Sequence, residues 1–179
     1  VAADWALVGD VTANNTAADT AKVNGVDATT VASNAANGAL VYADVMSDLK
    51  ITPVEKTAIN QEWNRIQKEY ASLLAQAQAL SLTTTTFTSA YNGLSTTAPA
   101  MSTILSSMTT TTTLTATQRN AYKTQYTTYY TQAVAITKAI NDKIAANAKA
   151  QADAKAKTFT AQPTTPYTKG DLWRNGGTI

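Results

Sequence analysis

Three glutamates with regular spacing are the residues whose pattern comes closest to that of a catalytic site. Glu55, Glu62 and Glu69 recur at intervals of seven residues. Two carboxylates that converge on one glycosidic bond can hydrolyse it. On a helix, however, successive members of this set lie about 10 Å apart along the axis. We therefore interpret the three as a solvated stripe on one helical face and expect no catalytic residue among them.

The remaining residue types offer little other chemistry. The sequence has no cysteine and no histidine, which excludes disulfides, thiol nucleophiles, Cys or His zinc sites and Ser-His-Asp relays. No acidic residue lies between Tyr70 and Asn141, so this stretch cannot cage a divalent metal. Solvated turns are favoured over a calcium site for the aspartates of the loop-rich start, Asp4, Asp10, Asp19 and Asp27. We expect no metal, no cofactor and no enzymatic activity.

The charge balance limits the partners. Lys and Arg number 14 against 12 Asp and Glu, and charged residues make up 15% of the chain, where soluble domains average about 25%. This weak positive charge argues against nucleic acid as a partner. The sequence has no run of about 18 apolar residues, so we expect no membrane insertion. The start at Val1, without a methionine, favours a processed product or a piece of a longer protein.

Aromatic side chains could form a platform that stacks on sugar rings. Helical spacing favours core packing instead for one set, Trp63, Tyr70, Tyr91, Tyr122, Tyr126 and Tyr129. Tyr130 lies off this spacing, and Trp5 and Trp173 lie in segments expected to be extended. Trp173, Tyr130 and Trp5 are therefore the candidate contacts for a glycan or a partner. For Trp173 we favour packing on a small β module or on the helical stem.

The elements that position these residues begin with an extended N-terminal arm at residues 1–26. A connecting helix is predicted over residues 27–50, with Asp27 as its cap. Its seam is rich in small side chains: Val31, Ala35, Gly38, Tyr42, Val45 and Leu49. Because a lone helix of this kind is marginal in water, we expect it to self-associate, as a homotrimer. Packing on other helices of the same chain is the alternative.

Residues 51–158 are predicted to form a helical bundle. A capping box of Thr52 and Glu55, with Pro53 at the first helical position, begins its first helix. The apolar seam of this helix reads Ile59, Trp63, Ile66, Tyr70, Leu73, Ala77 and Leu80, and the helix ends near residues 81–83. On its polar side, Arg65 and Glu69 are expected to form an exposed i, i+4 pair.

The second half of the bundle contains one interrupted and one long helix. Pro99 is expected to kink or split the segment 87–108, and the threonines at 109–113 are expected to form a loop. A second capping box, Thr115 with Gln118, begins a helix whose seam is Tyr122, Tyr126, Tyr129, Ala133, Ile136 and Ile140. Packing should stop near Ile144, and an exposed alanine-rich stem should continue toward Lys157. Residues 159–166 are predicted to be a Pro-rich linker, and 167–179 the start of a β module.

Two peptides carry a resemblance to a known group of proteins. Residues 48–70, DLKITPVEKTAINQEWNRIQKEY, resemble a helical segment of tailed-bacteriophage tail fibres, tail-tip proteins and tail-associated minor structural proteins. As in that family, a Thr-rich connection, a helix with a Tyr-Asn pair at residues 91–92 and a long helix rich in Tyr, Ala and Lys follow in order. Residues 163–173, PTTPYTKGDLW, are similar to the linker and strand that follow those helices.

The resemblance covers roughly residues 27–175 and implies a structural part of the virion tail, often trimeric, that spaces or presents host-binding domains. It carries over no catalytic residue. We expect a mainly α fold: a heptad-patterned helical hairpin or three-helix bundle with a preceding helix, an extended arm and a partial β module. The expected role is a non-enzymatic link between the tail and distal host-recognition modules, with other copies of the chain and other tail proteins as partners. A bacterial surface glycan is a further candidate partner. The alternative is a bacterial surface or cell-wall glycan-binding module.

Overall fold

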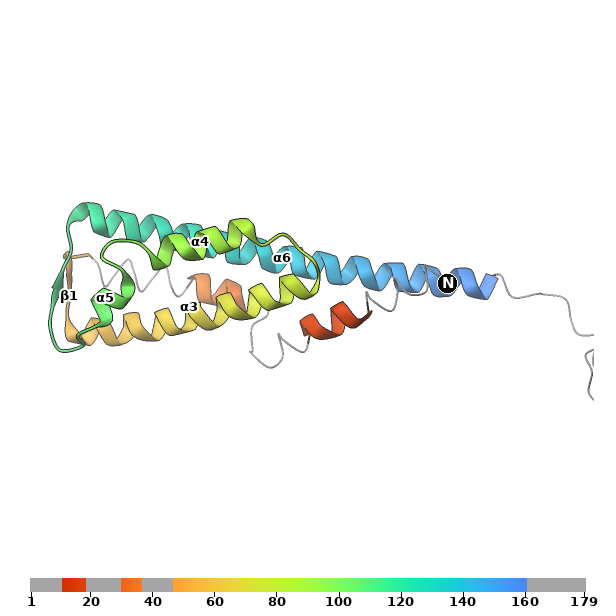
Figure 1. The fold of residues 1–179 in the computed structure, drawn as a ribbon, viewed down its shortest axis with the longest axis horizontal. Helices are drawn as coiled ribbons and strands as arrows, with labels where there is room; N and C mark the ends of the chain where they lie inside the picture. Colours follow the sequence, from red (N-terminus) through yellow and green to blue (C-terminus); the bar gives the residue numbers. More distant parts are fainter. Residues whose placement is uncertain (1–10, 19–29, 37–46, 161–179) are drawn as a thin grey trace, which may run out of the picture.

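The computed structural model describes residues 11–18, 30–36 and 47–160, with side chains up to residue 157. The fold is mainly α, with a small two-stranded antiparallel sheet. The three longest helices, α3 (Pro53–Ala79), α4 (Thr85–Ser95) and α6 (Ala116–Thr160), lie side by side along the long axis of the molecule (Figure 1). The linker predicted over 159–166 is wrong in its first two residues, which belong to α6. The rest of this linker, the β module, Trp5 and Trp173 lie outside the described residues.

The start of α3 confirms the first capping box. The Glu55 amide donates to Thr52 Oγ1 at 3.4 Å, and the Thr52 amide donates to Glu55 Oε2 at 2.8 Å. These two bonds satisfy amides that the first turn of a helix leaves without intrahelical partners. The helix ends at Ala79, just before the predicted stop.

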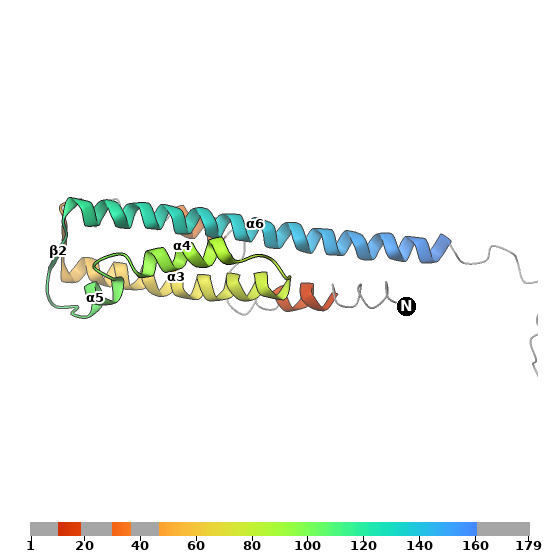
Figure 2. The ribbon, with the colours of Figure 1, turned by 45° about the horizontal axis from the view of Figure 1, so that its top comes forward.

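The second capping box is confirmed in the same way at the start of α6. The Thr115 amide donates to Gln118 Oε1 at 2.8 Å, and the Gln118 amide donates to Thr115 Oγ1 at 3.2 Å. The helix then runs to Thr160 and extends well beyond the ends of α3 and α4 (Figure 1, Figure 2). Most of its side chains after Ile144 are exposed, as predicted for a stem.

Pro99 divides the segment between α3 and α6, as expected. α4 ends at Ser95, the Ala98–Pro99 peptide bond is cis, and the five-residue helix α5 (Met101–Leu105) follows. Both pieces contribute to the core, because Phe87, Leu94, Met101 and Ile104 are buried.

The prediction of a featureless loop at residues 109–113 is wrong at its end. β2 (Thr112–Thr113) pairs antiparallel with β1 (Lys50–Ile51), and the Leu114 amide donates to the Leu49 carbonyl at 2.8 Å. Leu49 has a φ of 63° and is therefore not part of the helix predicted over 27–50. The pairing ties the start of α3 to the start of α6, which sequence periodicity cannot indicate for two-residue strands.

The N-terminal region departs from the predicted extended arm. Residues 11–18, which lie within that arm, are helical. Residues 30–36 lie within the connecting helix predicted over 27–50, and they are helical too. The Asn14 side chain donates to the Ile144 carbonyl at 3.3 Å and accepts from Asn147 Nδ2 at 3.0 Å. This contact buries Asn147 and carries the packing one turn beyond the predicted limit at Ile144. The helix at 11–18 thus depends on α6 as a partner, which a local sequence pattern does not reveal.

The core confirms the aromatic seam of α6, where Tyr122, Tyr126, Tyr129 and Ile140 are buried. Val31, from the helix at 30–36, is also fully buried within its own chain. Among the described residues, no helix has the length and apolar character to cross a membrane.

Candidate functional site

The buried face of α3 carries acidic side chains. Its inward positions are Ile59, Glu62, Ile66, Glu69, Leu73, Gln76 and Leu80, all buried and separated alternately by three and four residues. Only 5% of Glu62 and 1% of Glu69 is exposed. The predicted solvated stripe is therefore wrong for these two residues, and the predicted seam is rotated by one position along α3, because α6 supplies the hydroxyl groups that these carboxylates need inside a core.

Glu62 joins α3 to α6 through an ion pair and a tyrosine. Arg65 Nε donates to Glu62 Oε2 at 3.0 Å, and Arg65 Nη2 pairs with Glu62 Oε1. The Tyr130 hydroxyl also donates to Glu62 Oε1. Arg65 thus forms its ion pair with Glu62 at i, i+3, and the exposed i, i+4 pair predicted with Glu69 is not formed.

Glu69 joins α3 both to α6 and to the helix at 30–36. The Tyr129 hydroxyl donates to Glu69 Oε1 at 3.0 Å and lies 3.3 Å from the Ile66 carbonyl. Asn34 Nδ2 donates to Glu69 Oε2 at 2.7 Å, and the Asn34 carbonyl accepts from Arg65 Nη2 at 3.1 Å. We refer to Asn34, Glu62, Arg65, Glu69, Tyr129 and Tyr130 together as the buried polar network.

Burial dominates the electrostatics of this network. Desolvation raises the pKa of Glu69, against the opposing effect of the hydrogen bonds from Asn34 and Tyr129. Desolvation also raises the pKa of Tyr129 and of Tyr130, so both phenols stay neutral and act as donors. A connected network of this kind fixes the positions of three helices relative to one another.

Of the three candidate contact residues for a glycan or a partner, the structure describes Tyr130 alone. Only 7% of Tyr130 is exposed, and its hydroxyl is used inside the network, so the expectation that it contacts a glycan is corrected. Tyr130 lies off the tyrosine seam of α6, but it faces α3 from the position next to that seam. Trp5 and Trp173 lie outside the described residues, so they stay predictions.

The other predicted aromatic core residues lie on the opposite flank of α3. Tyr70 stacks on Tyr91 with ring centroids 3.8 Å apart and planes 4° from parallel, and Trp63 is parallel to Tyr91 with centroids 6.0 Å apart. These three rings are half-buried between α3 and α4. Because Tyr91 stacks against both of its neighbours, its two faces are occupied by protein, which favours packing over sugar binding.

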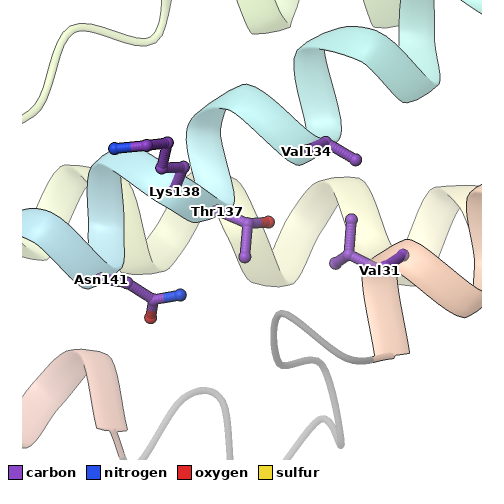
Figure 3. Close-up of a pocket in the computed structure, with 6 residues that line it drawn as sticks. Val31, Val134, Thr137, Lys138 and Asn141 are labelled. Atoms are coloured by element: carbon purple, nitrogen blue, oxygen red, sulfur yellow. The ribbon is translucent and has the colours of Figure 1, made fainter.

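A shallow hollow of about 260 Å³ lies between the helix at 30–36 and α6 (Figure 3). Val31 and Ala32 line one side, and Val134, Thr137, Lys138 and Asn141 line the other. No carboxylate lines it, so the hollow has no acid–base pair. Among the described residues, no three Asp, Glu, His or Cys side chains gather where they could hold a metal ion.

A repeating signal in the sequence points to the network. Gln76 continues the seven-residue series of Glu55, Glu62 and Glu69, and Ile59, Ile66 and Leu73 lie three or four residues from these positions. Polar residues that recur every seven positions and alternate with apolar residues three or four positions away are typical of a helix face that packs inward with some polar positions buried. Asn34, by contrast, has no such local signal.

Comparisons with known proteins give one partial match. No family model matches the chain, and no solved structure matches it. Among curated proteins, the chain is similar to a "Tail fiber protein" of Enterococcus phage phiEF24C, with 38% identity over 58 residues. The matched stretch makes up 32% of this chain and 3% of the phage protein. This distant, partial similarity suggests a structural role in a phage tail.

Proposed function

We propose that the chain is a non-enzymatic structural segment of a phage tail fibre or tail-tip protein, in which it links the tail to distal host-recognition modules. The similarity to a phage tail fiber protein is the observation that carries this proposal. The described fold supports it, because an elongated bundle with a protruding helix separates its two ends in space (Figure 2).

Internal cross-links between helices fit a part that transmits force. The network ties α3 to α6 at Glu62 and at Glu69, and the paired strands tie the starts of the same two helices. Sliding α3 along α6 would break a buried ion pair and its hydrogen bonds together, which is costly. A spacer benefits from that resistance, whereas a flexible linker does not need it.

The location in the virion tail can be tested on phage particles that encode the chain. We expect gold-labelled antibodies raised against the chain to mark the tail, and peptides of the chain to appear in purified virions by mass spectrometry. Antibodies absorbed with the chain beforehand are the control. Virions that lack these peptides would contradict the proposal.

The absence of enzymatic activity is also part of the proposal. The two buried glutamates are held by Arg65, Tyr129, Tyr130 and Asn34, so neither is free to attack a substrate. We expect no turnover of peptidoglycan or capsular polysaccharide. Turnover that disappears in Glu62→Gln while the variant stays folded would show the opposite.

The glycan-binding alternative depends on the two tryptophans outside the bundle. On a glycan array we expect no specific binding by the chain. Specific binding that is lost in Trp173→Ala or Trp5→Ala would favour the alternative. Tyr130→Phe is the matched control, because the buried Tyr130 ring should leave any surface binding unchanged.

We propose that copies of the chain associate as a homotrimer, through a surface other than the predicted seam. Val31 is buried within its own chain and Leu49 is not helical, so neither residue is available on that seam. Val134, which is 46% exposed on α6, is an apolar candidate for the contact. Sedimentation should give a trimer that dissociates in Val134→Glu and persists in Thr128→Glu, an exposed position on the same helix. A monomer at all concentrations would contradict this proposal.

A further inference from the structure

We propose that Glu69 is a proton-binding site: its carboxyl group is neutral in the folded bundle at neutral pH, and removing the proton loosens the joint at which residues 30–36 dock. Glu69 is 1% exposed and connects its own helix, α3, to the helix at 30–36 through Asn34 and to α6 through Tyr129. The inference concerns a property of the fold and does not depend on the role in a phage tail.

The charges of the network do not balance if both glutamates are ionised. Arg65 is the one cationic side chain among its members, and it forms its ion pair with Glu62. Tyr129 and Tyr130 face Glu69 and Glu62 from α6 as neutral phenols. The helix at 30–36 contributes no titratable side chain, since its sequence is TVASNAA. A neutral Glu69 leaves one carboxylate for one guanidinium, whereas an ionised Glu69 leaves a buried negative charge without a cation of its own in the network.

The hydrogen-bond geometry suits a protonated carboxyl. With the proton on Oε1, Glu69 donates to Tyr129 Oη across the same 3.0 Å, and Tyr129 turns its hydroxyl to the Ile66 carbonyl at 3.3 Å. Oε2 is then the carbonyl oxygen and accepts from Asn34 at 2.7 Å. The side-chain oxygens of Glu69 and Tyr129 then all keep a partner, which is the condition for a stable buried group.

Loss of the proton acts on the joint because Glu69 itself makes one of the docking contacts. Asn34 provides two polar bonds between the helix at 30–36 and α3, one through its side chain and one through its carbonyl. An isolated helix of this length does not hold in water. An ionised Glu69 therefore gains hydration most readily by detaching these residues, since α3 and α6 are also joined at Glu62 and by the paired strands.

The pH dependence follows from the direction of the pKa. Burial raises the pKa of Glu69 above its ordinary value of 4.5, so the folded chain retains a proton that the unfolded chain releases. The stabilisation that the Glu69 carboxyl contributes is complete at pH values below its pKa in the unfolded chain. It is lost as the pH rises through its pKa in the folded chain. Between these two values the unfolding constant should increase by up to about tenfold per pH unit.

Infrared spectroscopy of the whole chain gives a direct test. The chain has three glutamates, so Glu55→Gln, Glu62→Gln and Glu69→Gln cover every glutamate carboxyl. We expect the C=O stretch of a protonated carboxyl at neutral pH, lost in Glu69→Gln and retained in the other two variants. Tyr129→Phe should shift the band, because it removes the hydrogen-bond partner. No band at neutral pH, or loss of the band only in Glu62→Gln, would overturn the proposal.

Hydrogen exchange tests the effect on the joint. Protection of the amides at residues 30–36, corrected for the intrinsic exchange rate, should fall as pH rises, while that of residues 122–136 in α6 stays constant. In Glu69→Gln, whose amide is neutral at every pH, protection at 30–36 should no longer depend on pH. Protection that is independent of pH in the unmodified chain would overturn the coupling to the joint.

Discussion

Tyr130 on α6 donates a hydrogen bond to Glu62 on α3, inside the bundle and away from water. The two residues are 68 positions apart in the chain, so the bond joins two helices that are distant in the sequence. Arg65 completes the arrangement by pairing with the same carboxylate. A contact of this kind costs desolvation, and it permits only one alignment of α3 against α6.

Glu62→Ala should therefore be strongly destabilising. It leaves Arg65 without its ion-pair partner and Tyr130 without its acceptor, and breaking a buried pair in this way costs about 3 kcal/mol or more. Because Arg65 is partly exposed, water compensates for part of this cost, and the expected loss in the free energy of unfolding is about 2 to 4 kcal/mol. Urea denaturation followed by circular dichroism measures it. Gln67→Ala, at an exposed position of the same helix, should cost less than about 0.5 kcal/mol; equal losses would contradict the buried placement of Glu62.

Thr52→Ala should destabilise the bundle by about 0.5 to 2 kcal/mol, because it removes the N-cap of α3. The hydroxyl lost here accepts from the Glu55 amide and donates to its carboxylate. Thermal unfolding of the variant tests this. Thr57→Ala is the matched control, since Thr57 is exposed in the same helix and its hydroxyl donates to the Pro53 carbonyl one turn earlier. A larger loss of stability in Thr57→Ala than in Thr52→Ala would argue against the cap.

Asn147→Ala should release the helix at residues 11–18 from α6. Asn147 is buried and donates to Asn14, which also donates to the Ile144 carbonyl. We expect faster amide exchange at residues 11–18 and unchanged exchange in α3, because the contact is local. Asn141→Ala, an exposed position two turns earlier, should leave residues 11–18 protected. Faster exchange in α3 as well would mean that Asn147 supports the whole bundle.

Gly93→Ala should stabilise α4 slightly, by about 0.5 to 1 kcal/mol, because alanine is the better helix former. A Cβ atom at Gly93 would lie 2.6 Å from Gln125 Oε1, the end of a flexible side chain that can turn away. Gly93→Leu is the contrasting variant, since its larger side chain needs more room on the side of Gln125. A loss of stability in Gly93→Ala would show that Gln125 cannot move.

Much of the bundle could be predicted from local signals alone. Both capping boxes, the split at Pro99 and the tyrosine seam of α6 follow from residue types at fixed short spacings, and the structure contains all of them. Local patterns suffice there because hydrogen bonds at a helix end and the burial of one apolar face involve residues within a few turns.

The tertiary structure decided which flank of α3 faces inward. Apolar residues at Ile59, Ile66 and Leu73 are shared by two possible seams, one continuing through Trp63 and Tyr70 and the other through Glu62 and Glu69. The first is covered by the rings of α4, and the second is completed by the hydroxyls of α6 and the amide of Asn34. Sequence periodicity indicates how apolar each face of a helix is. It does not identify the residues, distant in the sequence, whose hydrogen bonds allow an acidic face to be buried. For the same reason the helix at residues 11–18 and the strand pair were decided only when the chain had folded.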